Sequence, residues 1–334
     1  MDLEQARREF NERARIFAQL RDEALFILEP AIKDAQIKIH SVANRVKTVE
    51  SFLGKIQRKQ FEEPFEKIRD IVGIRVICLF LSDIERIGQI IRSSFTVLDE
   101  DDKIEGAEVS SFGYMSMHFI VTMKGSHSGP RYDPIAKLPF EIQVRTIAMD
   151  AWANVSHYLD YKTDKDVPTD LRRDFYALSG LFYVADRHFE MFFLSRQESQ
   201  EKLVEIFQEP PSARQFIQEI NLDSLSAYLH SKYPDREHSE AISISELVEV
   251  LIKAGYRTID DVEKRINKGH DAFLKRESEA VTQHYFSDVG AARWTLEIVD
   301  DNFLQAEIDL TPQLKGIYGA RKKQVEKYRK LLKD

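Results

Sequence analysis

Cysteine is nearly absent from the sequence: Cys78 is the single cysteine among 334 residues, and it lies in an apolar run. One cysteine excludes a disulfide framework or a zinc set, and the chain fits a reducing cytoplasm. No apolar run approaches the length of about 20 residues that a membrane-spanning helix needs. The first residues are charged throughout and contain no apolar signal segment. The sequence therefore predicts a cytoplasmic protein without a membrane partner.

The composition is that of a globular protein with a core, because 43% of the residues are apolar and 31% are charged. The length fits one large domain or two. A net charge of −8 argues against a surface devoted to nucleic acid. The C-terminal tail nevertheless gathers basic residues, which leaves an RNA or a protein partner open for that part: Lys315, Arg321, Lys322, Lys323, Lys327, Arg329, Lys330 and Lys333.

Strand and helix patterns alternate in the first half of the chain. Helices are predicted at 2–28, where Pro30 interrupts the pattern, at 48–59, and from Ser82 as N-cap to about 93. Strands are predicted at 37–42, 71–80, 95–98, 117–123 and 140–144, with an acidic turn at 99–102 and a long-looped hairpin formed by the last two strands. This mixture predicts an α/β (α+β) fold, a mixed sheet flanked by helices.

The second half reads as almost entirely helical from residue 170, with a short strand also considered at 294–298. Residues 243–266 suggest a helical hairpin around Gly255. The run Glu-Pro-Pro-Ser after residue 208 breaks the helical pattern. We therefore predict two domains, 1–208 and 209–334, the second mostly helical and either regulatory or partner-binding.

Two polar faces meet where a predicted strand passes into a helix. Glu141, Gln143 and Arg145 share one strand face because side chains alternate along a strand. The following helix stacks a second polar row at helical spacing: Asp150, Asn154, His157 and Tyr161. This arrangement suggests the wall of an active site, although a solvated edge strand followed by an amphipathic helix explains the same pattern.

Asp70 stands at the start of a buried-looking strand, where an ionised carboxylate is costly without a partner. Mg²⁺ would be a suitable partner, since it takes one or two carboxylates together with phosphate oxygens. Glu141 is the natural second ligand if its strand pairs beside that of Asp70. The alternative is an ion pair of Asp70 with Arg69 or Arg75.

A basic segment precedes Asp70. Ser51, Lys55 and Arg58 can line one side of a helix, and Arg45 and Lys47 stand on the strand that leads into it. Several cationic donors together suit a polyphosphate. A solvated basic helix face is the alternative, and for a lone cluster it is the more frequent explanation.

A fourth segment combines an aromatic ring with polar groups. Strand alternation places Tyr114, Ser116 and His118 on one face, after Gly113. A ring beside a hydroxyl and an imidazole could stack on a base and hydrogen-bond to it. An ordinary polar outer face of a strand is the alternative.

The four segments together, in this order, resemble the synthetase domain of the RelA/SpoT-type small alarmone synthetases. The motifs are Arg-x-Lys…Ser…Lys, Asp-x-x-Gly-x-Arg, Gly-Tyr-x-Ser-x-His and Glu-x-Gln-x-Arg-Thr…Asp-x-Trp-Ala, within a core of about residues 35–165. The resemblance implies a nucleotidyltransferase-like fold and transfer of the pyrophosphate of ATP to the ribose 3′-hydroxyl of GDP or GTP, which makes (p)ppGpp.

The resemblance also assigns roles by position. Asp70 and Glu141 would hold Mg²⁺, and Glu141 would activate the hydroxyl. ATP binding is implied for Arg45, Lys47, Ser51, Lys55 and Arg58. Acceptor binding is implied for Tyr114, which would stack on the guanine, and for Ser116, His118, Gln143, Arg145, Asn154 and His157.

Two departures from the family pattern keep alternatives open. Met115 stands where guanosine-specific members often have a basic or amide residue. The acceptor could then be an adenosine nucleotide or the 3′ end of tRNA, as in toxin-like relatives. Only about 40 residues precede the basic segment, too few for a hydrolase domain, so hydrolysis is not expected. A non-catalytic nucleotide-sensing module and a homo-oligomer also stay open.

Overall fold

The computed structural model describes residues 2–102, 116–159, 167–209, 218–279, 286–311, 316 and 318–332. The chain divides into two compact units, Met1–Phe193 and Leu194–Asp334. The limit between them lies inside helix α6 (Arg172–Gln208), whereas the sequence placed a domain boundary at the end of the same helix. The domain boundaries stay a prediction.

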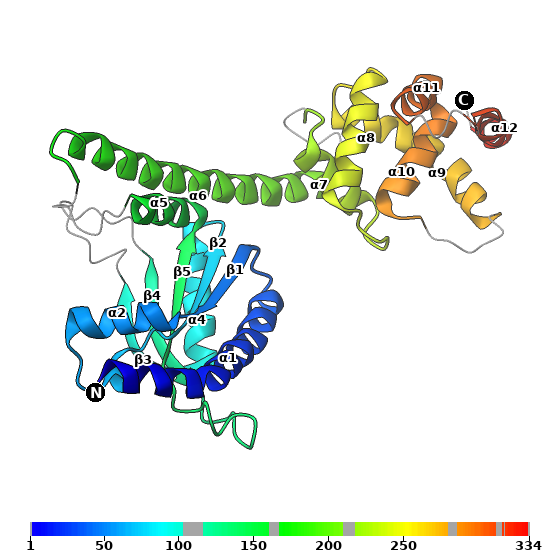
Figure 1. Cartoon of the computed structure of the whole chain (residues 1–334). Coiled ribbons are helices and arrows are strands. Elements are labelled where there is room, and N and C mark those ends of the chain that lie inside the picture. The colour runs from blue at the N-terminus through cyan, green and yellow to red at the C-terminus, as the bar shows by residue number, and fades with distance from the viewer. Residues whose placement is uncertain are drawn as a thin grey trace. The chain divides into compact units, whose positions relative to one another are not determined.

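The first unit is built on a five-stranded sheet of order β1-β2-β5-β4-β3 (Figure 1). The strands are β1 (Ile39–Val46), β2 (Val72–Cys78), β3 (Phe95–Asp102), β4 (Met117–Met123) and β5 (Phe140–Thr146). Strands β2 and β5 are parallel, and the other neighbouring pairs are antiparallel. The mixed sheet is therefore confirmed, and so is the long-looped hairpin of β4 and β5.

Helices cover the apolar face of this sheet. The helices of the unit are α1 (Leu3–Asp34), α2 (Val49–Lys59), α3 (Pro64–Lys67), α4 (Leu81–Ser94), α5 (Ile147–Tyr158) and the first part of α6. Helix α1 contacts β1 and β2, and α4 contacts β2, β3, β4 and β5 (Figure 1). Ile74, Phe119 and Ile142, at most 1% exposed, lie in the common core with residues of α1 and α4.

The opposite face of the sheet is polar, because every second residue of the central strands is only half buried. The strand register sets the order of its side chains. Arg45 lies opposite Gly73, Gly73 opposite Glu141, and Gln143 opposite His118. Residues that come from four separate parts of the sequence are thus neighbours on one face.

The second unit is helical within its described residues, apart from one isolated β-bridge between Glu219 and Thr258. It contains the end of α6 and the helices α7 (Leu222–Lys232), α8 (Ala241–Lys253), α9 (Ile259–Ser278), α10 (Asp288–Val299), α11 (Asp301–Leu310) and α12 (Tyr318–Arg329). Gly255 links α8 to α9 with φ of 93°, a conformation that glycine adopts without strain. The two predicted helices and the turn between them are therefore found, but α8 packs mainly on α7 and α11 and α9 mainly on α10.

Four predictions of local structure were wrong. Helix α1 continues through Pro30 to Asp34, because burial of Leu28 and Ile32 on the same side offsets the missing hydrogen bond. The acidic residues 99–102 extend β3, where Glu100 receives hydrogen bonds from Arg92.

The other two corrections concern helix α4 and the segment 294–298. Phe80 is the N-cap of α4, and Ser82 lies in its first turn, where its backbone N–H donates to Glu190. Residues 294–298 belong to helix α10, because a short apolar run that is buried on all sides does not distinguish a strand from a helix.

No helix within the described ranges is both long enough and apolar enough to cross a lipid bilayer.

Candidate active site

A cationic pocket lies at the N-terminus of α2. Its volume is about 610 Å³, and it is lined by Arg45, Val46, Lys47, Thr48, Ser51, Gly54 and Arg58. Thr48 is the N-cap of α2 and accepts a hydrogen bond from the Ser51 backbone N–H at 3.2 Å. A helix N-terminus with nearby cationic side chains favours phosphate groups. No carboxylate among the described residues forms an ion pair with Arg45 or Arg58, so both guanidinium groups are available to a ligand.

Asp70 lies beside this pocket and is bound by two lysines. Lys47 Nζ donates to one carboxylate oxygen at 2.8 Å, and Lys55 Nζ donates to the other at 2.9 Å. Burial acts to raise the pKa of Asp70, but the two lysines outweigh it and hold this pKa below its ordinary value. The alternative partners suggested by the sequence, Arg69 and Arg75, are not the ones that the structure gives.

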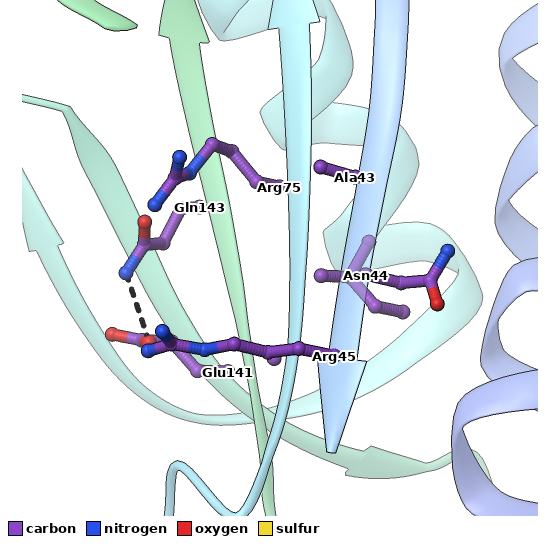
Figure 2. A pocket seen from close by; sticks show the side chains of 8 residues that line it. Ala43, Asn44, Arg45, Arg75, Glu141 and Gln143 are labelled. Carbon is purple, nitrogen blue, oxygen red and sulfur yellow. Dashed lines mark hydrogen bonds between the residues drawn. The ribbon is translucent and has the colours of Figure 1, made fainter. Parts of the chain in front are cut away.

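A second pocket, of about 170 Å³, opens on the polar sheet face (Figure 2). It is lined by residues of three adjacent strands: Ala43, Asn44 and Arg45 of β1, Gly73, Ile74 and Arg75 of β2, and Glu141 and Gln143 of β5. Arg45 lines this pocket as well as the cationic one. The two pockets therefore adjoin at one residue, Arg45.

Gly73 allows Arg45 to reach across the sheet. A Cβ atom at position 73 would lie 3.8 Å from Cγ and from Nε of Arg45, so the arginine chain passes directly over the glycine. Glu141 is the register partner of Gly73 on the next strand. A side chain larger than alanine at position 73 would occupy the path of Arg45.

Glu141 is held by hydrogen bonds to both of its carboxylate oxygens. His118 Nδ1 lies 3.0 Å from Oε1, and Gln143 Nε2 donates to Oε2 at 2.9 Å. Ser116 Oγ lies 2.5 Å from the other ring nitrogen of His118. This chain fixes the orientation of the Glu141 carboxylate, as partners behind a reactive group do.

The carboxylates of Asp70 and Glu141 lie near one end of the sheet. Asp70 precedes β2 and Glu141 begins β5, and these two strands are parallel. Burial and the nearby charge of Asp70 both act to raise the pKa of Glu141. The hydrogen bond and charge of His118 outweigh them, so this pKa lies below its ordinary value. Glu141 therefore interacts electrostatically with Asp70 and is nevertheless ionised at neutral pH.

Arg145 is buried, at 6% exposure, on the strand that carries Glu141. Its Nη2 donates to Gln143 Oε1 at 2.5 Å, but its Nε and Nη1 have no hydrogen-bond partner among the described residues. Burial, reinforced by the neighbouring Arg75, lowers the pKa of Arg145 to about 10. Nη1 also lies 3.5 Å from Asp150 Oδ1 as an ion pair, so two donors of this buried cation are without a hydrogen bond but only Nε lacks an acidic neighbour. Such donors are suited to an anionic or carbonyl oxygen.

Asp150 connects the strands to α5. It accepts from Arg75 Nη1 at 3.0 Å and from Asn154 Nδ2 at 2.8 Å. Asn154 therefore joins the polar network through Asp150, whereas His157 is exposed near the end of α5 and lines neither pocket. Tyr114, the expected base-stacking residue, lies outside the described residues.

The structure brings together most of the site residues predicted from the sequence, and it adds Arg75. The sequence considered Arg75 only as a partner of Asp70. Alternation from Gly73 places its side chain on the polar face, beside Gln143. That alternation, within the motif Asp-x-x-Gly-x-Arg, was the signal that could have identified it.

Comparison with known proteins gives a match to the family described as "Region found in RelA / SpoT proteins" over residues 44–166. GTP pyrophosphokinase YjbM of Bacillus subtilis (strain 168) is 35% identical over 144 residues, which are 42% of this chain and 65% of the relative. GTP pyrophosphokinase YwaC of the same organism is 35% identical over 139 residues, 40% of this chain and 63% of the relative. The chain thus matches just under two thirds of the length of these curated relatives.

Among solved structures, a GTP pyrophosphokinase family protein from Streptococcus pneumoniae aligns with a TM-score of 0.47 and 25% identity, covering 60% of this chain and 97% of the other. The matched family region contains Arg45, the Asp70 motif and both strands of the second pocket that carry Gly73 and Glu141. Residues 44–166 of the chain therefore match the region found in RelA/SpoT proteins.

Proposed function

We propose that the chain is a pyrophosphokinase that transfers the β,γ-pyrophosphate of ATP to the ribose 3′-hydroxyl of GDP or GTP. The observation that carries this proposal is the shared position of Arg45 between a cationic pocket and a second pocket that contains a fixed carboxylate. One guanidinium can then contact the transferred phosphates while the acceptor lies beside Glu141. Such positioning and charge neutralisation are the main requirements of phosphoryl-type transfer.

ATP phosphates would occupy the cationic pocket. Arg45 and Arg58 would bind phosphate oxygens, the Ser51 hydroxyl would donate to one, and the N-terminus of α2 would add its dipole. Lys47 and Lys55 both hold Asp70, and Lys47 also lines this pocket, so its ammonium group can exchange the carboxylate for phosphate.

The acceptor would enter the second pocket with its 3′-hydroxyl toward Glu141. The hydroxyl oxygen forms a bond to the β-phosphorus of ATP while the bond from that phosphorus to the bridging α–β oxygen breaks, and AMP leaves. Glu141 accepts the hydroxyl proton. Its carboxylate is ionised and held by His118 and Gln143, which suits a general base.

Asp70 and Glu141 fit a magnesium ion. Each of their carboxylate oxygens accepts one hydrogen bond and keeps a further lone pair, and the two groups are electrostatically coupled. When bound, Mg²⁺ would neutralise charge on the phosphates between the two carboxylates. This chain's own contribution is to hold both carboxylates ionised near the same end of the sheet.

Guanosine nucleotides are the proposed acceptors because both curated relatives are named GTP pyrophosphokinases. The unused donors of Arg145 and the amide of Gln143 supply groups that can bind an acceptor. A tRNA acceptor is less well supported, since three basic residues of α12 are bound to carboxylates of this chain. Arg321 pairs with Glu297, Lys327 with Glu279 and Arg329 with Asp301.

The test is incubation of the full chain with Mg²⁺, ATP labelled at the γ-phosphate, and GDP, GTP, ATP or tRNA, followed by separation of the products. We expect label on the guanosine nucleotide, and at least about 100-fold slower labelling by a Glu141→Gln preparation. Label on a 3′-pyrophosphorylated adenosine nucleotide or on tRNA would overturn the assignment of the acceptor. Retention of all label on unreacted ATP would overturn the enzymatic function and favour a nucleotide-sensing module.

A further inference from the structure

Three side chains of the second unit converge at the junction of α7 and α10. His230 lies in the last turn of α7, His238 follows that helix, and Asp288 begins α10. His230, His238 and Asp288 each offer one possible ligand atom, and these atoms lie within 4.8 Å of one another. These three atoms are all potential metal ligands and come from three separate segments.

The distances fit ligands around an ion better than they fit hydrogen bonds. Asp288 Oδ2 lies 3.7 Å from His230 Nε2 and 3.5 Å from His238 Nδ1, both longer than a hydrogen bond between such groups. Ligands about 2.0–2.1 Å from a tetrahedral Zn²⁺ are separated by roughly 3.3–3.5 Å from one another. The two observed distances are close to this separation between ligands.

Two of the three ligand atoms are buried without a partner. Asp288 is fully buried, and its Oδ2 and the Nε2 of His230 have no hydrogen-bond partner among the described residues. A buried carboxylate oxygen without a partner destabilises the folded state, because it has lost its hydration without gaining a hydrogen bond. A cation between Oδ2 and the two imidazoles would remove this cost.

The other oxygen of Asp288, Oδ1, accepts three hydrogen bonds, and these fix the direction in which Oδ2 points. Oδ1 accepts hydrogen bonds from the Ser239 backbone N–H at 3.0 Å, from Ser239 Oγ at 2.6 Å and from the Val289 N–H at 2.6 Å. Partners of this kind behind a carboxylate orient metal ligands and are as important as the ligands themselves.

We propose that His230, His238 and Asp288 bind one Zn²⁺ ion in the second unit. Two imidazoles and one carboxylate suit zinc, whereas Mg²⁺ prefers oxygen ligands alone. The His230 and His238 side chains are 38% and 48% exposed, so water can complete the coordination. The scarcity of cysteine excluded only sites built from thiolates. The ion connects the end of α7, the segment after it and the start of α10, and thereby stabilises this unit.

The first experiment measures binding of Zn²⁺ to the full chain after removal of metals with a chelator, in competition with a chromophoric chelator. We expect one Zn²⁺ per chain, and with Co²⁺ as a second probe the visible absorption of a tetrahedral site. Zinc should also raise the melting temperature of the second unit, because an ion that binds only the folded state stabilises it.

Variants separate this site from adventitious surface binding. Asp288→Asn keeps an oxygen for Ser239 but loses the charged ligand, and His238→Ala removes an exposed ligand without disturbing the core. Both should lose the bound ion. Ser239→Ala should weaken affinity about 10–100-fold, as loss of a supporting partner does. The control is His188→Ala, which removes an exposed histidine on α6 and should bind zinc normally.

The proposal is overturned if the stripped chain binds no zinc, or if the His238 and Asp288 variants bind it as well as the wild type does. Because His238 is exposed, misfolding does not explain a loss in that variant, and an unchanged far-ultraviolet circular dichroism spectrum checks this point. These measurements do not use pyrophosphate transfer, so their outcome does not depend on the proposed function.

Discussion

Asp70→Asn removes one of the two charge-assisted hydrogen bonds that Asp70 makes, because the amide of asparagine offers a single acceptor oxygen to Lys47 and Lys55. A hydrogen bond to a charged group contributes about 1.5–3 kcal/mol. Water recovers little of this loss, since the Asp70 side chain is 20% exposed and that of Lys47 is 11% exposed. We expect the first unit to lose about 1.5–3 kcal/mol of unfolding free energy, or roughly 3–12 °C in melting temperature.

The chain offers a fluorescent probe for each unit, which makes this loss measurable. Trp152 is buried in the first unit and Trp294 in the second. In a Trp294→Phe background, the fluorescence of Trp152 follows unfolding of the first unit alone. Asp34→Asn is the matched control: Asp34 is an exposed carboxylate at the end of α1, and its loss should change stability by less than about 0.5 kcal/mol.

A second measurement tests whether Asp70 competes with phosphate for the two lysines. Without Mg²⁺, ATP should bind the Asp70→Asn variant at least as tightly as the wild type, because Lys47 and Lys55 are no longer paired with a carboxylate. With Mg²⁺, the variant should lose turnover. An unchanged melting temperature, or a loss of magnesium-free ATP binding, would refute the argument from the lysine pairs.

Three further predictions concern the same site. Glu141→Gln should lower kcat for pyrophosphate transfer by about 10²–10⁴-fold while ATP binding persists; near-normal turnover would remove Glu141 from the chemistry. Tyr114→Ala should raise KM for the acceptor more than KM for ATP, and equal increases would mean that the ring is structural. The pKa values of Asp70 and Glu141 are lowered from ordinary values of 3.8 and 4.5. Their stabilising contribution is therefore complete above about pH 4.5 and is lost as the pH falls through the lowered values. The urea midpoint of the first unit should stay constant from about pH 7 to pH 5 and fall below about pH 4; a decline that begins above pH 5 would contradict this assignment.

Strand alternation and the start of the helix after residue 47 were readable from the sequence because they depend on residues close together in the chain. The spacing of Glu141 and Gln143 placed them on one face, and the helix predicted from Thr48 is found, with Thr48 as its N-cap. The ordered motifs gave the family, which the comparison over residues 44–166 bears out. Local rules failed at Pro30 and at 294–298, where burial in tertiary structure decides the conformation.

The partners of the charged residues were not readable, because they depend on register between distant strands. Asp70 was expected to pair with Arg69 or Arg75, but Lys47 enters from the end of β1 and Lys55 from α2. Arg75 instead reaches Asp150, which begins α5 beyond a different strand. The zinc site proposed for the second unit also depends on contacts between distant segments. Nothing in the spacing of His230, His238 and Asp288 indicates that the end of α7, the segment after it and the start of α10 meet.

Arg45 links the two halves of the proposed reaction, and this connection has an energetic consequence. Its side chain lies over Gly73 and borders both pockets, without an ion-pair partner among the described residues. In the absence of ligand it faces the positive field of Arg145 and Arg75, since Arg45 contributes to lowering the pKa of Arg145. A triphosphate that neutralises Arg45 therefore removes repulsion on Arg145, but it also weakens the positive field that attracts an anionic acceptor. Because both nucleotides are anions, charge alone should make the binding of ATP and of the acceptor anticooperative unless Mg²⁺ neutralises the phosphates.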